Sequence, residues 1–399
     1  MSYLDGWSPE LLKHRAESIR GRLADKNLQA LAVTDPLNLT YVTGFFLDIA
    51  PWERPVVAVI PVDGSPFMIL CELSTNHLRF SLEQGRGLIT DIRFYTEHPR
   101  QVNRLYTVRE WSTLVAETFR EKDITKGNIA VDSNPQGLER RLKPQLPDLS
   151  FTDASMLLRE MRVVKCEEEL DLLRKAGALS DWGQIRYKES IELGKTGLEI
   201  GTKVAHLMAC EAVKRYPNYQ ISISASGSPS IGMPHGLGGL SGEPIKKGDT
   251  IINGVTARLN MYGVENERTF IVGEPTEKQK KLFKVMLEAQ LKAVGVCVEG
   301  NRVSDIDAVA QKVIEDAGYG DLVMHRTGHG MGLGGHEYWD DTAFNHRTLR
   351  AGMVTSVEPG IYVYGESGFR HSDTVIVGKD KPEVVTEYTK ELEYLTVRI

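Results

Sequence analysis

The pattern of apolar and polar residues divides the chain into two parts that meet near residue 160. In the first part, helical repeats alternate with short strand-like runs, an arrangement typical of an α/β domain. Helices are predicted over 9–23, 108–121 and 137–143, and strands over 28–33, 55–60, 66–70 and 128–131. We expect this part to form a mixed sheet flanked by helices.

The second part is dominated by longer helical repeats. Helices are predicted over 166–191, 196–215, 275–296 and 303–318, and strands over 220–226, 249–271, 353–364 and 370–378. The first of these helices should begin next to Lys165, because Glu167, Glu168 and Glu169 suit the positive N-terminal end of a helix. We therefore predict two domains, residues 1–160 and 161–399, in an α/β (α+β) protein.

Composition and charge narrow the range of functions. Hydrophobic residues make up 41% and charged residues 26% of the 399, as in an ordinary globular protein long enough for two domains. The formal net charge of -6 is mild and the two signs are mixed, which argues against nucleic acid as a partner. No apolar run reaches the roughly 20 residues that span a bilayer, and no signal-peptide pattern is present. We expect a cytoplasmic protein without a membrane partner.

The polar residues of the second part gather in five short segments. They are 233–236 (MPHG), 264–270 (VENERTF), 325–337 (HRTGHGMGLGGHE), 357–362 (VEPGIY) and 369–374 (FRHSDT). Any one of these segments is a weak signal. Their order and spacing together are specific.

In order and spacing, these segments closely resemble the pita-bread family, which includes methionine aminopeptidase, aminopeptidase P, prolidase and creatinase. The resemblance is dense over 165–385 and looser in the first part, where 35–38 (DPLN) and 40–44 (TYVTG) carry it. It implies a small N-terminal creatinase-like α/β domain and a C-terminal pita-bread domain in which helices flank an antiparallel sheet.

The metallopeptidase members of that family hold two metal ions, and the resemblance assigns their five ligand positions in this chain. The two aspartates fall on Gly254 and Glu265, the histidine on His329, and the two glutamates on Glu358 and Ser372. Glycine has no ligand atom and serine offers a neutral hydroxyl, whereas two neighbouring cations need several anionic oxygens. We therefore expect no metal pair and no cofactor. A single ion on Glu265, His329 and Glu358 stays open as an alternative.

Creatinase, a member that works without metal, matches this chain at other positions. The resemblance implies that Glu267, directly before Arg-Thr, and Glu358 are catalytic residues that hold the substrate, and that His235 is the catalytic histidine. Creatinase also takes an aromatic residue and an arginine from the N-terminal domain of the neighbouring subunit, in a segment ending Arg-Pro. The segment Trp52-Glu53-Arg54-Pro55 is similar, which implies a homodimer with a shared active site.

These residue types can hydrolyse a C–N bond of a small molecule without a metal. Two glutamates in one cleft, here Glu267 and Glu358, can bind a planar cation such as a guanidinium through paired hydrogen bonds. A histidine titrates near neutral pH, so His235 can relay a proton from water to a departing amine. Arg54 offers a planar guanidinium to a substrate carboxylate, and Trp52 excludes solvent.

Four further residues are candidate substrate contacts. His329 and His336 can donate hydrogen bonds to the substrate or orient the glutamates. Glu265 and Glu267 are two apart on a predicted strand, so their side chains share a face, and we expect Glu267 to be the one that reaches the substrate. His371 neighbours an emptied ligand position, and a one-residue slip would bring it into the site.

Three functions of different classes follow from these residues. The leading one is a metal-independent, creatinase-like hydrolase that cleaves a C–N bond of a small guanidino, amidino or amide-containing carboxylate. After His336 the chain lacks the second arginine with which creatinase holds its substrate carboxylate, so the identity of the substrate stays open. The alternatives are a metal-dependent Xaa-Pro dipeptidase or aminopeptidase with a degenerate metal site, and a non-catalytic member that binds a ligand.

Overall fold

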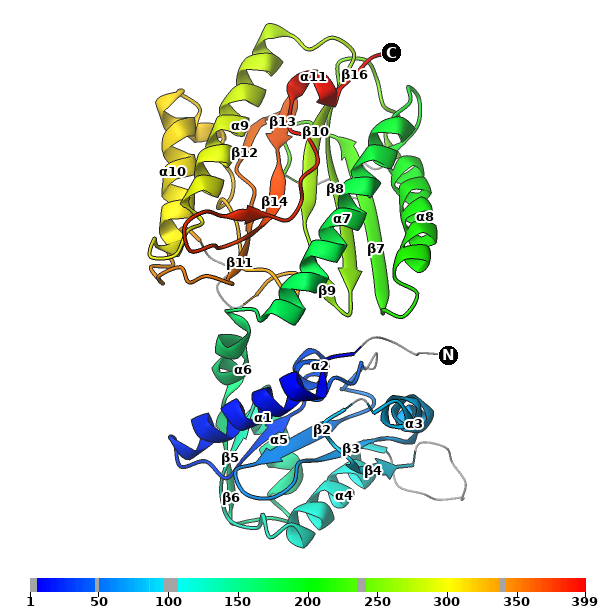
Figure 1. The fold of residues 1–399 in the computed structure, drawn as a ribbon, viewed down its shortest axis with the longest axis vertical. Helices are drawn as coiled ribbons and strands as arrows, with labels where there is room; N and C mark the ends of the chain where they lie inside the picture. Colours follow the sequence, from blue (N-terminus) through cyan, green and yellow to red (C-terminus); the bar gives the residue numbers. More distant parts are fainter. Residues whose placement is uncertain (1–5, 47–49, 86, 97–106, 235–241, 338–341) are drawn as a thin grey trace. The chain divides into compact units, whose positions relative to one another are not determined.

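The structure is a computed structural model that describes residues 6–46, 50–85, 87–96, 107–234, 242–337 and 342–399. The chain forms two compact units, Met1–Met161 and Arg162–Ile399 (Figure 1). Each unit is built around a sheet of its own. Among the described residues, no helix has the length and apolarity that crossing a membrane requires.

The first unit is built around a six-stranded mixed sheet with the strand order β4-β3-β2-β1-β5-β6. Its elements are α1 Pro9–Ala24, β1 Ala30–Val33, α2 Pro36–Thr43, β2 Val57–Pro61, β3 Phe67–Cys71, α3 Thr75–Glu83, β4 Asp91–Tyr95, α4 Thr107–Glu121, β5 Gly127–Val131, α5 Pro135–Leu142, β6 Leu149–Asp153 and α6 Ser155–Arg162. Trp111, Val115 and Phe119 recur at helical spacing along α4 and pack with Phe67 and Ile69 of β3 in the core.

The second unit contains an eight-stranded sheet whose main path is β11-β14-β10-β8-β7, and a separate pair, β12-β13. Its elements are α7 Glu167–Ser190, α8 Gly197–Arg215, β7 Ile221–Pro229, β8 Thr250–Leu259, β9 Tyr262–Gly263, β10 Asn266–Val272, α9 Glu277–Val296, α10 Val303–Asp316, β11 Val354–Val357, β12 Gly360–Val363, β13 Ser367–Arg370, β14 Ser372–Ile376, β15 Glu383–Val384, α11 Leu392–Leu395 and β16 Thr396–Val397. Helix α7 contacts β8, helix α8 contacts β7, and α9 lies beside α10 (Figure 1).

The strands along that main path are all antiparallel to their neighbours, and helices flank the sheet. This is the arrangement predicted for the C-terminal domain. Helix α8 lies very close to the edge strand β7, because a Cβ on Gly197 would be only 1.9 Å from the carbonyl oxygen of Gly227. Glycine is therefore required where the helix crosses the strand.

One row of residues crosses this sheet and fixes the place of the site. Ser226 of β7 pairs with Gly254 of β8, Gly254 pairs with Glu267 of β10, and Glu267 pairs with Ser372 of β14. Directly opposed residues on neighbouring strands project to the same face of a sheet. The row therefore places Gly254 and Ser372, two of the five ligand positions, on either side of Glu267.

Candidate active site

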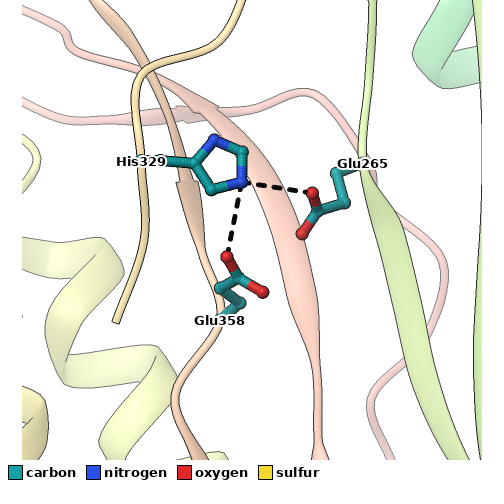
Figure 2. Close-up of side chains that lie close together, drawn as sticks. All are labelled: Glu265, His329 and Glu358. Atoms are coloured by element: carbon teal, nitrogen blue, oxygen red, sulfur yellow. Dashed lines mark ion pairs between the residues drawn. The ribbon is translucent and has the colours of Figure 1, made fainter. Parts of the chain in front are cut away.

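Three side chains converge at one point on this face of the sheet. Glu265 lies just before β10, His329 belongs to the glycine-rich loop 328–337, and Glu358 lies just after β11. His329 Nε2 is 3.4 Å from a carboxylate oxygen of Glu265 and 3.4 Å from one of Glu358 (Figure 2). Within the described parts of the chain, these are the three side chains of metal-ligating type whose ligand atoms lie close enough to hold an ion, all within 4.8 Å of one another.

The orientation of the His329 ring shows what the three residues share. Nδ1 faces the carbonyl oxygen of Gly330 at 3.1 Å, so the neutral ring carries its hydrogen on Nδ1 and donates it there. Nε2 then presents a lone pair to the carboxylates of Glu265 and Glu358 (Figure 2). Electron-rich atoms gather in this way around a positive charge, which a proton, a metal ion or a cationic group of a substrate supplies. The three side chains could therefore hold a cation.

Backbone contacts with β11 hold the loop that carries His329. The backbone nitrogen of His329 donates to Ser356 Oγ at 3.0 Å, and the His329 carbonyl accepts from the Ser356 backbone nitrogen at 2.8 Å. A Cβ on Gly328 would lie 2.0 Å from the Ser356 carbonyl oxygen, so glycine is needed at this close approach. The ring of His329 is thereby aimed at the two glutamates.

Glu337 secures the other end of the same loop. Its backbone nitrogen donates to the Gly330 carbonyl at 2.9 Å, and its carboxylate accepts from the Gly334 backbone nitrogen at 3.1 Å. Arg162 Nε pairs with the second carboxylate oxygen at 3.1 Å, and both side chains are buried. Because each oxygen of the buried carboxylate has a partner, the pair keeps the loop in one conformation.

Arg370, which the sequence analysis did not single out, lies inside the site. Its Nη2 donates to Glu267 Oε1 at 2.6 Å, and its Nε lies 2.5 Å from Glu267 Oε2 as a close ion pair. Its Nη1 is 3.8 Å from Glu358 Oε2. A signal for this position was available, because Arg370 and Ser372 are two apart in an extended segment and so project to one face.

Burial and neighbouring charges act differently on the three carboxyl groups. Burial alone would raise the pKa of Glu265, but His329 in its protonated form, which donates from Nε2 and carries a positive charge, lowers it to about 2. Burial raises the pKa of Glu267 to about 7, against the opposing charge of Arg370. Burial and the negative charge of Glu265 raise the pKa of Glu358. Glu265 is therefore the carboxylate that stays ionised throughout the neutral pH range.

The charges in direct contact leave the site short of positive charge. When all three carboxyl groups are ionised, they carry three negative charges, and the guanidinium of Arg370, which contacts Glu267 and Glu358, leaves two of them unbalanced. One divalent ion beside Glu265, His329 and Glu358 would balance them, whereas two such ions would leave an excess of positive charge.

One of the two emptied ligand positions, Gly254, lines a pocket, and the other, Ser372, contacts Glu265. A Cβ added to Gly254 would lie 3.5 Å from Glu267 Oε1 and 3.5 Å from Ser226 Oγ, which is ordinary contact distance. Ser372 Oγ donates to Glu265 Oε1 at 2.6 Å. A pocket of about 420 Å³ opens here, and its lining includes Ser224, Ser226, Gly254, Glu267 and Arg370. Small side chains thus leave room for a ligand beside the charged cluster.

Two further predicted residues lie on different sides of the sheet. His336 is exposed, and its ring stacks on that of His329 with the ring centroids 3.7 Å apart. His371 is buried and packs edge-on against Phe283, with 5.1 Å between centroids, and neither of its nitrogens has a hydrogen-bond partner in the described chain. Strand alternation directs Arg370 toward the site and His371 away from it, so the slip that would bring His371 in does not occur.

The remaining predicted residues are not brought into the site by the described structure. In the first unit, Trp52 is 77% exposed, and Arg54 pairs with Glu53 at 2.8 Å. His235 lies outside the described residues. The roles of Trp52, Arg54 and His235 therefore stay predictions.

Both units resemble domains of known protein families. Residues 171–379 match the family described as Metallopeptidase family M24, and residues 15–164 match the Creatinase/Prolidase N-terminal domain. A protein named Xaa-Pro dipeptidase, from Pyrococcus furiosus, is 34% identical over 387 residues, which cover 96% of this chain and 100% of that protein.

Solved structures share the predicted two-domain fold. Dipeptidase PepE from Mycobacterium ulcerans has a TM-score of 0.80 and 26% identity, with 99% of this chain and 100% of that chain covered. The prolidase from Thermococcus sibiricus has a TM-score of 0.80 and 26% identity, with 96% of this chain and 98% of that chain covered. The fold class predicted from the sequence is confirmed.

Proposed function

Because this chain belongs to metallopeptidase family M24, we propose that it is a hydrolase that cleaves an amide-type C–N bond in a small substrate with the help of one divalent cation. The observation that carries the proposal is the convergence of His329 Nε2 with carboxylate oxygens of Glu265 and Glu358. This is the metal-dependent alternative of the sequence analysis. The relatives named Xaa-Pro dipeptidase support it over the metal-independent, creatinase-like function that the sequence favoured.

The three donors suit one metal ion in distance and in chemistry. Protein ligands bind zinc at about 2.0 to 2.2 Å, so two donors of a tetrahedral ion are roughly 3.4 Å apart. His329 Nε2 is 3.4 Å from an oxygen of Glu265 and 3.4 Å from one of Glu358. Three protein ligands and one open position are usual at a catalytic metal. When bound, such an ion supplies Lewis-acid polarisation of the scissile carbonyl.

Residues of the chain itself would orient the substrate and move the proton. Arg370 holds the Glu267 carboxylate at the wall of the pocket, where it can accept hydrogen bonds from substrate N–H groups. Ser372 Oγ fixes the Glu265 carboxylate with a hydrogen bond of 2.6 Å. We assign to His235 the transfer of a proton to the departing amine, as the sequence predicted.

The substrate is proposed to be a small molecule. The pocket of about 420 Å³ lies within the range of small-molecule sites, which is roughly 300 to 1,000 Å³. Xaa-Pro dipeptides are the first compounds to test, because the relatives are named for that activity.

A metal-free C–N hydrolase of creatinase type is the second candidate, and one observation favours it. Two of the family's carboxylate positions hold Gly254 and Ser372, and Arg370 brings a permanent cation into contact with Glu267. In that mechanism the guanidinium or amidinium of the substrate would supply the positive charge that the three converging side chains attract.

Assays on metal-stripped protein separate the two candidates. Protein treated with chelator is tested on Ala-Pro and on small guanidino and amidino acids, before and after addition of Mn²⁺ or Zn²⁺. We expect no turnover in the stripped protein and recovery when an ion is added. The recovery should disappear in Glu265→Gln and persist in the matched control Ser372→Ala. Full turnover of a guanidino or amidino acid in chelator would refute the metal-dependent proposal and establish the second candidate.

We further propose that the active protein is a homodimer in which Trp52 and Arg54 of one subunit contact the substrate in the other subunit's site. The similarity of the segment 52–55 to that of creatinase supports this arrangement. Mixing two inactive variants, Arg54→Gln and His235→Ala, tests it. In mixed dimers of a shared site, one of the two sites receives both intact residues, so part of the activity returns. No recovery in mixed dimers would refute the shared site.

A further inference from the structure

Arg258 is a half-buried cation without a partner on the face of the sheet that carries the site. In the parts of the chain that the structure describes, its guanidinium forms no hydrogen bond and no ion pair. Burial lowers the pKa of Arg258, and the charge of Glu265 opposes that shift. A charge that is partly removed from water, with no counterion in direct contact, costs some free energy. Such a group points to an anion that binds beside it.

The register of the sheet places Arg258 next to the catalytic cluster. The backbone nitrogen of Val264 donates to the carbonyl of Ala257 at 3.3 Å, which sets Glu265 opposite Thr256. Arg258 is two residues further along β8 and shares the face of Thr256. It is therefore a diagonal neighbour of Glu265, with about 7 to 8 Å between such positions. A small molecule held at the cation site can span that distance.

Two glycines make room for the Arg258 side chain. Gly263 pairs with Arg258 across the hairpin, and a Cβ there would lie 2.6 Å from Arg258 Cγ. A Cβ on Gly335 would lie 2.9 Å from Arg258 Nη2. The guanidinium thus rests against the loop that carries His336, whose ring stacks on His329. A cation positioned in advance loses little freedom when it binds a ligand.

We propose that Arg258 binds a carboxylate of the substrate, through paired hydrogen bonds from its guanidinium, and so selects small molecules with an acidic end. A planar guanidinium matches a carboxylate in this way. The inference rests on the proposed function for the reaction itself, and it adds Arg258 to the residues proposed to contact the substrate. The charge balance agrees, because a substrate carboxylate neutralises Arg258 and leaves the cluster of Glu265, Glu267 and Glu358 to the cation.

Equilibrium binding of acid–amide pairs tests this role directly. The probes are L-proline with L-prolinamide and guanidinoacetate with guanidinoacetamide, which represent the two candidate functions. Affinities are measured by isothermal titration calorimetry in the wild type, Arg258→Gln, Arg258→Lys and the exposed control Arg79→Gln, and thermal midpoints check that each variant folds. The wild type should bind the acid of at least one pair about tenfold or more tightly than the amide, as expected for a charge-assisted pair.

The variants separate Arg258 from an exposed arginine that no proposal places in the site. Arg258→Gln should bring the acid-to-amide affinity ratio close to one, Arg258→Lys should keep part of it, and the control Arg79→Gln should leave it unchanged. If Arg258→Gln does not fold, Gly335→Ala replaces it, because the added Cβ displaces the guanidinium and keeps the charge. An unchanged ratio in the folded variant, or no acid preference in the wild type, would overturn the proposal.

Turnover is scored separately on the same proteins. A wild type that hydrolyses none of the test compounds but retains an acid preference dependent on Arg258 would contradict the proposed function and support the carboxylate site. A wild type that hydrolyses one of the test compounds, with an acid preference that does not depend on Arg258, would support the proposed function and contradict the carboxylate site.

Discussion

Two clusters of buried charge lie on opposite faces of the same sheet, and they differ in their balance. In the first, Arg268 Nη2 of β10 is 2.9 Å from Asp373 Oδ1 of β14, and Lys390 Nζ is 2.7 Å from Asp373 Oδ2. Thr386 and Gln290 donate to the same two oxygens at 3.0 and 2.5 Å. Both oxygens have several partners and the cations are not fewer than the anions, so this cluster needs no charge from outside.

The second cluster is the candidate active site. Its carboxylates, on Glu265, Glu267 and Glu358, have the guanidinium of Arg370 as the permanent cation in contact with them. The difference teaches that buried charge by itself is no sign of function, because ion pairs of structural importance are buried too. Where buried charges of one sign are in excess and their side chains point to one place, a cation from the solvent or from a ligand can bind there.

The largest effect that separates the clusters concerns activity. Glu358→Gln removes one charged oxygen from the cation site, so we expect kcat/KM to fall at least about a thousandfold, because the ion and its orientation are lost together. The test uses the substrate identified in the metal add-back assay. Ser372→Ala, on the same face, is the matched control and should retain activity within about tenfold. Near-normal activity of Glu358→Gln would show that the second cluster is not needed for activity.

The next effect concerns the structural cluster. Asp373→Asn leaves Arg268 buried with weakened compensation, and we expect it to lower the free energy of unfolding by about 3 kcal/mol. Urea denaturation measures the change. Asp171→Asn is the control, because its pair with Lys175 is more exposed and should contribute less than about 1 kcal/mol. Equal losses in the two variants would show that the Arg268 pair is no more important than an exposed one.

Acid titration sharpens the same contrast. Burial alone would raise the pKa of Asp373, but the charges of Arg268 and Lys390 lower it from 3.8 to about 2. A folded-state pKa below the unfolded value stabilises the fold above about pH 4, and that contribution is lost as the pH falls toward 2. It amounts to about 2 kcal/mol. Urea midpoints of the wild type should therefore fall more steeply between pH 4 and 2 than those of Asp373→Asn; parallel curves would contradict the assignment.

The smallest effect has the opposite sign from that of Asp373→Asn. In metal-free protein, Glu358→Gln relieves repulsion among the carboxylates of the active site, so we expect a gain in unfolding free energy of about 1 kcal/mol. The measurement is urea denaturation in chelator. A loss of stability comparable to that of Asp373→Asn would mean that the active-site charges are balanced within the fold.

Long elements of the fold could be predicted from the sequence, because their apolar periodicity persists over many residues. The helix predicted over 166–191 is α7, Glu167–Ser190, with Cys166 as its N-cap. The short helix α2 was not predicted, although Asp35 caps it and Pro36 begins it. Six of its eight residues are buried, so no polar face reveals a helical period.

The site could be predicted only in part. The family positions identified Glu265, His329 and Glu358, which the structure brings together. Arg370 and Arg258 were missed, because strand alternation gives the face of a side chain but not its contacts across the sheet. The place of Arg370 depends on the register of β10 with β14, which pairs residues more than a hundred positions apart, and the place of Arg258 depends on the register of β8 with β10.

The number of ions per chain tests the central claim most directly. Protein loaded with Mn²⁺ and desalted is analysed by inductively coupled plasma mass spectrometry. The wild type is compared with Gly254→Asp/Ser372→Glu, which restores both ligand positions, and with Gly254→Ala/Ser372→Ala as the matched control; position 254 has room for a Cβ at 3.5 Å from its neighbours. We expect one ion in the wild type and in the control and two in the restored variant. Two ions in the wild type, or none, would contradict a site built for a single cation.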